Sequence, residues 1–116
     1  MSNHYARLML VVTRLRAPTD AAALEEFRHG LDQAHAVLAQ RPGYLGGEVG
    51  RNVDDPNLWV LSTRWENVGS YRRAIGSYDA KLLVQPFMIH AVDEPSAYEI
   101  VQPGTDLNEA GTRQLG

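Results

Sequence analysis

The sequence predicts one α+β domain whose elements follow the order β-α-β-β-α-β. Two segments carry apolar residues three and four positions apart, which is typical of amphipathic helices. Short apolar stretches flank them and indicate strands. A chain of 116 residues fits a single domain of ordinary size. We place this domain at residues 1–102 and expect residues 103–116, which are rich in glycine and polar side chains, to form a flexible tail.

Composition and charge narrow the class of protein. Apolar residues make up 44% of the chain and charged residues 22%, as in globular domains. The net charge of −3 is not the basic excess that nucleic-acid binding requires. The longest apolar stretch, Leu8–Val12, is far below the roughly 20 residues that span a bilayer, and the chain has no cysteine. We expect a cytoplasmic protein that binds neither nucleic acid nor membranes.

The first half of the domain begins with a strand and a helix. Residues 8–15 are apolar at both alternating positions, which indicates a strand covered on both faces. Pro18 and Asp20 mark the start of a helix, and Pro42-Gly43 ends it near Arg41. The apolar stripe of this helix consists of Leu24, Phe27, Leu31, Ala34 and Leu38.

A β-hairpin follows the first helix. Residues 44–51 predict an edge or bent strand, because their three glycines are typical of bulges. Asp54-Asp55-Pro56-Asn57 is a turn sequence, since proline presets φ and the Asp and Asn side chains bind nearby backbone. Residues 58–66 predict the returning strand. Alternation puts one set of its side chains on the core face: Trp59, Leu61, Thr63 and Trp65.

The second half of the domain is predicted as a helix and a final strand. Asn67 can cap the helix. Its apolar stripe consists of Val68, Tyr71, Ile75, Tyr78 and Leu82. Pro86 interrupts the apolar residues 83–90, which we interpret as a short helix or an irregular segment. Residues 97–102 complete the sheet.

This order of elements matches the ferredoxin-like fold, a four-stranded antiparallel sheet with helices on one face. Because residues 8–15 are apolar on both faces, the second face also needs cover. An identical subunit is the simplest candidate, so we expect a homodimer joined through sheet faces. Arg64, on that second face, either pairs with a partner carboxylate or packs its stem at the rim.

Three motifs accompany these elements: Arg41-Pro42-Gly43-Tyr44, Asp54-Asp55-Pro56 and Leu58-Trp59-Val60-Leu61-Ser62-Thr63-Arg64-Trp65-Glu66. Together with the apolar strand and amphipathic helix, they resemble the antibiotic biosynthesis monooxygenase family over residues 7–102. The resemblance implies a dimeric α+β barrel with a small pocket between sheet and helices. Some members of that family oxygenate aromatic polyketides there without metal, flavin or haem, whereas others degrade haem.

The resemblance also implies site residues. Quinone-forming members use a tryptophan at the strand end and a tyrosine six residues later, and Trp65 and Tyr71 match both. Those members have an asparagine four residues before the tryptophan, where this chain has Leu61. Haem-degrading members need an asparagine, a tryptophan and a histidine at positions that hold Thr13, Ala74 and Val84 here. Haem degradation is therefore disfavoured.

The predicted catalytic residues are Trp65, Tyr71 and His35. The indole N–H and the phenol can bind a substrate, although both rings also suit a packed core. His35 borders the apolar stripe of the first helix, where an imidazole can accept a proton near neutral pH or serve as a structural side chain bonded to backbone. The predicted substrate-binding residues are Trp65, Tyr71, Leu61, Phe27 and His90.

The other histidines, His4 and His29, are expected at the surface. Neither histidines nor carboxylates have metal-ligand spacing, and no phosphate-binding glycine loop is present, so we expect no metal or cofactor. We predict a cofactor-independent monooxygenase that acts on a small aromatic or enolic metabolite. The alternative is a small-ligand-binding or structural dimer of the same fold, which Leu61 favours. Haem binding with slow degradation is a third reading.

Overall fold

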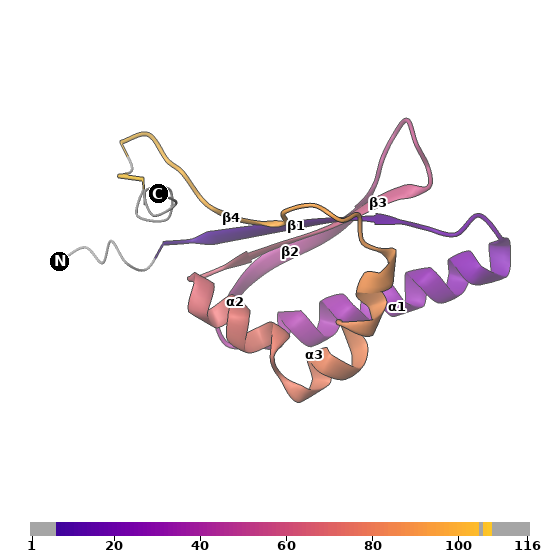
Figure 1. Ribbon diagram of the computed structural model, residues 1–116, viewed down its shortest axis with the longest axis horizontal. Coiled ribbons are helices and arrows are strands. Elements are labelled where there is room, and N and C mark those ends of the chain that lie inside the picture. Colours follow the sequence, from indigo (N-terminus) through magenta and orange to yellow (C-terminus); the bar gives the residue numbers. More distant parts are fainter. Residues whose placement is uncertain (1–6, 105, 108–116) are drawn as a thin grey trace.

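A computed structural model of the chain describes residues 7–104, 106 and 107. These residues form two layers, a β-sheet and a group of helices packed on one of its faces (Figure 1). His4 and most of the predicted tail lie outside the described residues. No helix in the described part of the chain has both the length and the apolar character that a membrane crossing demands.

The elements occur in the predicted order. They are β1 (Met9–Arg16), α1 (Ala21–Ala39), β2 (Tyr44–Arg51), β3 (Leu58–Trp65), α2 (Val68–Ile75), α3 (Tyr78–Leu83), the 3-10 helix η1 (Pro86–His90) and β4 (Ala97–Glu99). The strand order in the sheet is β2-β3-β1-β4, and every pair is antiparallel. This topology confirms the predicted ferredoxin-like α+β fold.

Helix α1 follows its sequence pattern closely. The Asp20 side chain caps it and accepts a hydrogen bond of 3.0 Å from the Ala23 N–H. Four of the five residues of the predicted stripe are buried beneath the sheet: Phe27, Leu31, Ala34 and Leu38. Leu24, the fifth, packs against this core and is partly buried. Local capping and periodicity therefore determine how α1 meets the sheet.

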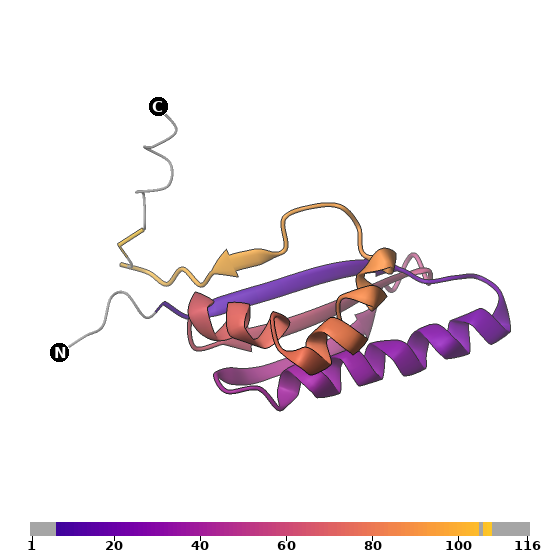
Figure 2. The same cartoon turned by 60° about the horizontal axis from the view of Figure 1, so that its bottom comes forward.

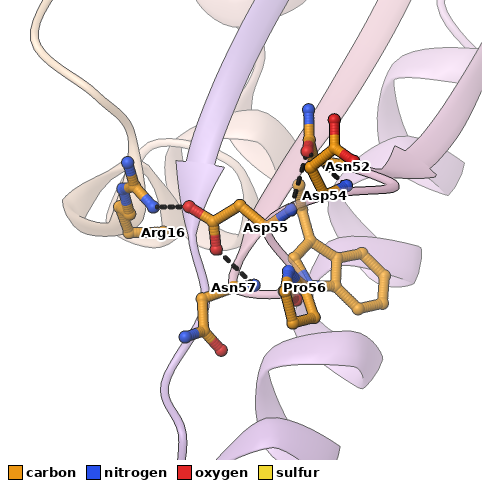
Figure 3. Close-up of polar contacts among 7 residues, drawn as sticks. Arg16, Asn52, Asp54, Asp55, Pro56 and Asn57 are labelled. Atoms are coloured by element: carbon orange, nitrogen blue, oxygen red, sulfur yellow. Dashed lines mark hydrogen bonds and ion pairs between the residues drawn. The ribbon is translucent and has the colours of Figure 1, made fainter.

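The turn between β2 and β3 is held by side-chain hydrogen bonds to backbone (Figure 3). Asn52 Oδ1 accepts from the N–H groups of Asp54 and Asp55, both at 2.8 Å. The two Asp55 oxygens bind the Asn57 N–H at 3.0 Å and Arg16 Nη1 at 2.7 Å. The Arg16 guanidinium and the Asn57 N–H lower the pKa of Asp55. The predicted turn is confirmed, and the contact with Arg16 links it to the end of β1.

Strand β2 starts with a bulge at the edge of the sheet, as its glycines predicted. Its register with β3 shifts between Tyr44 and Gly46. Gly43, just before the strand, has φ +92°, a backbone conformation that disfavours a side chain. A Cβ added at Gly43 would also lie 2.4 Å from the Ser70 Cβ, so the β2 entry packs directly against α2.

The second helical region differs from its prediction. It is two helices, α2 and α3, because the backbone breaks at Gly76 and the Ser77 side chain caps a new helix. The break changes which side chains face the sheet. Tyr78 and Leu82 of the predicted stripe are 75% and 53% exposed, and Val68 is exposed as well. The residues buried instead are Ser70, Ala74, Ala80 and Val84.

The two remaining segments have the predicted type of secondary structure. Residues 86–90 form the short 3-10 helix η1, with Pro86 at its start. β4 covers residues 97–99 and is shorter than the predicted strand, although the Ile100 N–H still donates to the Leu8 carbonyl at 2.9 Å. All helices lie on the same face of the sheet, and the opposite face carries none of them (Figures 1 and 2).

Candidate functional site

A cavity of about 190 Å³ lies between the sheet and the helices, where the family resemblance implied a pocket. Two antiparallel residue pairs of β1 and β3 form its floor, Val11 with Thr63 and Thr13 with Leu61. The helices supply the other lining residues: Leu38, Tyr71, Ile75, Val84, Gln85 and Met88. A mainly apolar lining with a few polar groups is typical of small-molecule sites.

The polar lining groups are three hydroxyls and one amide. Gln85 donates from Nε2 to the Ile75 carbonyl at 2.8 Å, so part of its amide is engaged. Among the described residues, neither Thr13 nor Tyr71 has a hydrogen-bond partner for its hydroxyl. None of the described lining residues is a histidine, a carboxylate or a cationic side chain. The cavity therefore offers neutral hydrogen-bonding groups rather than charge.

Tyr71, a predicted catalytic residue, lines the cavity from α2. Burial raises the pKa of its phenol, which keeps the hydroxyl protonated and able to donate. Its ring packs against Trp65 with centroids 5.7 Å apart. Leu61, predicted to bind substrate, lines the floor from β3. These two residues are brought together at one cavity.

Trp65 lies beside the cavity on the same face of β3 as Leu61 and Thr63, and it does not line the cavity. Its side chain is fully buried at 0% exposure, and its ring contacts Tyr44 and Tyr71 at 5.4 and 5.7 Å between centroids. The indole Nε1–H donates to Thr63 Oγ1 at 2.9 Å. The N–H predicted to meet a substrate thus donates to a neighbouring side chain, and Trp65 touches the cavity only through two lining residues, Thr63 and Tyr71.

His35 also lies away from the cavity. Its Nε2 is 2.7 Å from the hydroxyl of Tyr44, a hydrogen bond that joins α1 to β2. Burial raises the pKa of Tyr44, and the nearby Arg64 opposes this shift. Since the Tyr44 ring also contacts Trp65 edge-on, the three side chains form one aromatic cluster: His35, Tyr44 and Trp65.

Phe27 and His90 belong to a second aromatic cluster. Phe27 is buried in the core, and its ring lies 5.1 Å from His90, 5.3 Å from Phe87 and 5.6 Å from Trp59. Neither predicted residue lines the cavity. The cluster packs η1 against α1 and the hairpin end of β3.

The sequence reasoning did not single out Thr63 as a site residue. Alternation along β3 did place it on the core face with Leu61 and Trp65. The signal in the sequence that could have identified Thr63 is its position: its hydroxyl lies between two large apolar side chains, Leu61 and Trp65, on a face predicted to be buried. Met88 and Gln85 carried no comparable signal, because they follow the break that separates α2 from α3. Within the described residues, no group of three histidine or acidic side chains lies close enough to hold a metal ion.

Comparison with known proteins agrees with this architecture. The family model described as antibiotic biosynthesis monooxygenase matches residues 8–81, more than half of the chain. No curated protein sequence matches.

Two solved structures illustrate the similarity in fold. SnoaB, a cofactor-independent oxygenase from Streptomyces nogalater, is 21% identical with a TM-score of 0.70, over 84% of this chain and 96% of that one. A conserved protein from Methanosarcina mazei is 16% identical with a TM-score of 0.68, over 84% of this chain and 97% of that one. The chain belongs to the antibiotic biosynthesis monooxygenase family.

Proposed function

We propose that the protein is a cofactor-independent monooxygenase that oxidises a small electron-rich phenol or enol. The observation that carries this proposal is the apolar cavity between β1, β3 and the helices, with hydroxyl groups on its walls. Such a site excludes solvent water from the bound substrate, while its hydroxyl groups can still form hydrogen bonds with an oxygen atom of that substrate. Membership of the family, and the fold shared with an oxygenase of the same chemical class, support the proposal.

The proposed reaction requires no resident redox group. The substrate loses a proton, and its anion passes one electron to O₂, which gives a carbon radical and superoxide. These two combine through a new C–O bond, and a proton completes a hydroperoxide. Loss of water then converts the original CH₂ group to a carbonyl. One atom of O₂ ends in the product and the other in water, so the overall change is CH₂ + O₂ → C=O + H₂O.

The lining groups determine which substrates suit this route. The described lining contains no carboxylate or imidazole to remove the first proton. Substrates that are themselves acidic, such as phenols and stabilised enols, need the least help from a base. In the proposal the protonated Tyr71 hydroxyl donates to the oxyanion as it forms, and Trp65 holds the Tyr71 ring in place.

The size of the cavity limits the substrate. An apolar cavity of roughly 150 Å³ holds a benzene molecule in a well-studied case. The volume of about 190 Å³ here therefore suits one ring or two fused rings without rearrangement. We infer that the substrate is smaller than a large polycyclic aromatic.

Oxygen uptake tests this function directly. The panel contains one-ring and two-ring phenols and a three-ring anthrone, and the product is identified by its gain of one oxygen atom from ¹⁸O₂. Tyr71→Phe is expected to lower uptake about 100-fold, the usual effect of removing an oxyanion donor. The matched control is Tyr78→Phe, because Tyr78 is an exposed tyrosine of α3. If no member of the panel raises uptake above the rate without protein, the proposal is rejected.

Ligand binding without turnover is the second candidate. Leu61 favours it, because this apolar side chain lies on the floor where oxygen-transferring relatives were expected to carry an amide. This candidate predicts that a phenol raises the melting temperature in proportion to its occupancy. It also predicts that the same phenol is recovered unchanged.

A further inference from the structure

We propose that Thr63 is a second donor, beside Tyr71, to the oxygen atom of the aromatic ligand, and that Trp65 turns the Thr63 hydroxyl hydrogen into the cavity. The inference rests on the proposed function, since it assigns a donor within the same cavity. It concerns binding of a phenol or enol oxygen, so it can be tested apart from oxygen transfer.

Hydrogen-bond counting supports this role. An indole N–H only donates, whereas a threonine hydroxyl donates one hydrogen and accepts through its lone pairs. Thr63 Oγ1 accepts the Trp65 Nε1–H at 2.9 Å, so the Thr63 hydrogen has to point elsewhere. Within the described residues no acceptor receives it. Thr63 is only 2% exposed, and a buried unpaired donor is costly.

The direction of the Thr63 side chain is restricted by β2. A Cβ built on Gly47 would lie 3.0 Å from Thr63 Cγ2, so the methyl group faces the backbone of β2. The hydroxyl is the other branch at the same carbon, so it does not share the direction of the methyl group, and its oxygen lies 2.9 Å from the Trp65 indole nitrogen. Thr63 lines the cavity over the paired residues of β1 and β3, so its side chain borders the space that a ligand would occupy. Since threonine has few χ1 rotamers, Gly47 and Trp65 together keep the hydroxyl in this position.

The other two lining hydroxyls are not held in this way. Thr13 and Tyr71 have no hydrogen-bond partner among the described residues, so their O–H bonds can rotate. A donor whose direction is already fixed loses less entropy on binding. It also interacts more strongly with a phenolate or enolate oxygen than with a neutral one. Thr63 is therefore suited to select oxygen-bearing rings from plain aromatic hydrocarbons.

The experiment compares two probes of similar shape, 1-naphthol and 1-methylnaphthalene, by calorimetry on the full chain. The readout is the ratio of the two dissociation constants. A substitution that weakens the binding of both probes equally leaves this ratio unchanged. Thr63→Val keeps the shape of the side chain and is expected to reduce the preference for 1-naphthol about 3- to 10-fold, as expected for loss of one hydrogen bond. Thr63→Ser is expected to restore most of that preference.

Two further variants make the result specific. Thr13→Val removes a hydroxyl from the same floor and is expected to change the ratio less than Thr63→Val does. Trp65→Phe keeps the Thr63 hydroxyl but frees its rotation, and an intermediate ratio is expected. If Thr63→Val alone does not fold, the pair Thr63→Val with Trp65→Phe replaces it, because removing both partners leaves no buried N–H unpaired.

The outcomes separate this inference from the proposed function. Failure of the unaltered protein to bind 1-naphthol overturns the inference, as does a Thr63→Val ratio within twofold of the unaltered one. A loss as large in Thr13→Val also overturns it. A lowered ratio without oxygen uptake from any substrate leaves Thr63 as a ligand-binding residue and rejects the monooxygenase instead.

Discussion

The imidazole of His35 and the hydroxyl of Tyr44 form a hydrogen bond of 2.7 Å between α1 and the edge strand β2. Tyr44 in turn stands edge-on to Trp65, with ring centroids 5.4 Å apart. This histidine therefore belongs to the aromatic cluster beside the cavity, and it does not line the cavity itself. The contact indicates a role in holding α1 against the sheet.

His35→Gln tests that role. The amide is a poorer partner for the Tyr44 hydroxyl than the imidazole is, and loss of the His35–Tyr44 hydrogen bond is expected to lower the free energy of unfolding by about 0.5–1.5 kcal/mol. Oxygen uptake should stay within about threefold of the unaltered rate, since a general base contributes roughly 100-fold or more. Urea denaturation and oxygen uptake are measured on the same preparation. A loss of uptake beyond 100-fold, with normal stability, would make His35 the base after all.

The raised pKa of Tyr71 leads to a prediction about how the stability of the protein depends on pH. Its pKa is raised above the ordinary 10.0 by burial, so the folded protein keeps a proton that the unfolded chain loses. Stability is therefore complete below pH 10 and falls as the pH rises further. Tyr71→Phe should flatten this decline above about pH 10, although Tyr44, whose pKa is also raised, retains part of it. Denaturation at several pH values checks the slope, with Tyr78→Phe as the control.

Gly43 and Gly104 offer a matched pair of backbone substitutions. Both have positive φ, +92° and +83°, so alanine strains either backbone. Only at Gly43 does an added Cβ meet other atoms, because the Ser70 side chain lies within 2.4 Å, whereas at Gly104 nothing lies within 4 Å. Gly43→Ala is expected to cost about 2–3 kcal/mol of stability, and Gly104→Ala much less. Equal losses would contradict the proposed packing of the β2 entry on α2.

The sheet face opposite the helices leads to a prediction about assembly. Leu10, Val12 and Val60 alternate with the buried residues of β1 and β3, and they are only partly buried in the single chain. We propose that the sheet face of a second copy covers them. Light scattering should give the mass of a dimer at micromolar concentration, and Val12→Glu should yield the monomer. Val53→Glu, at a hairpin position that is 95% exposed, is the control. A single-chain mass for the unaltered protein would exclude this interface.

Local sequence signals determined most of the fold. Alternation placed Leu61, Thr63 and Trp65 on one face of β3, and the Asp54–Asn57 turn set the hairpin between β2 and β3. The stripe of α1 and the caps at Asp20 and Asn67 were equally local. Each of these features depends on residues within a few positions of one another, so the sequence is sufficient to predict them.

Tertiary structure decided the rest, including the site. Ser77 caps a new helix after Gly76, and this small local change rotated Tyr78 and Leu82 out of the core. The cavity is lined by residues of β1, α1, β3, α2, the link between α3 and η1, and η1 itself, and no spacing along the chain encodes that meeting. The sequence alone determined which residues of α1 and β3 face the core. Only the packing of helices on the sheet decided that Tyr71 and Thr63 share a cavity while His35 lies outside it, because such contacts join residues far apart in the chain.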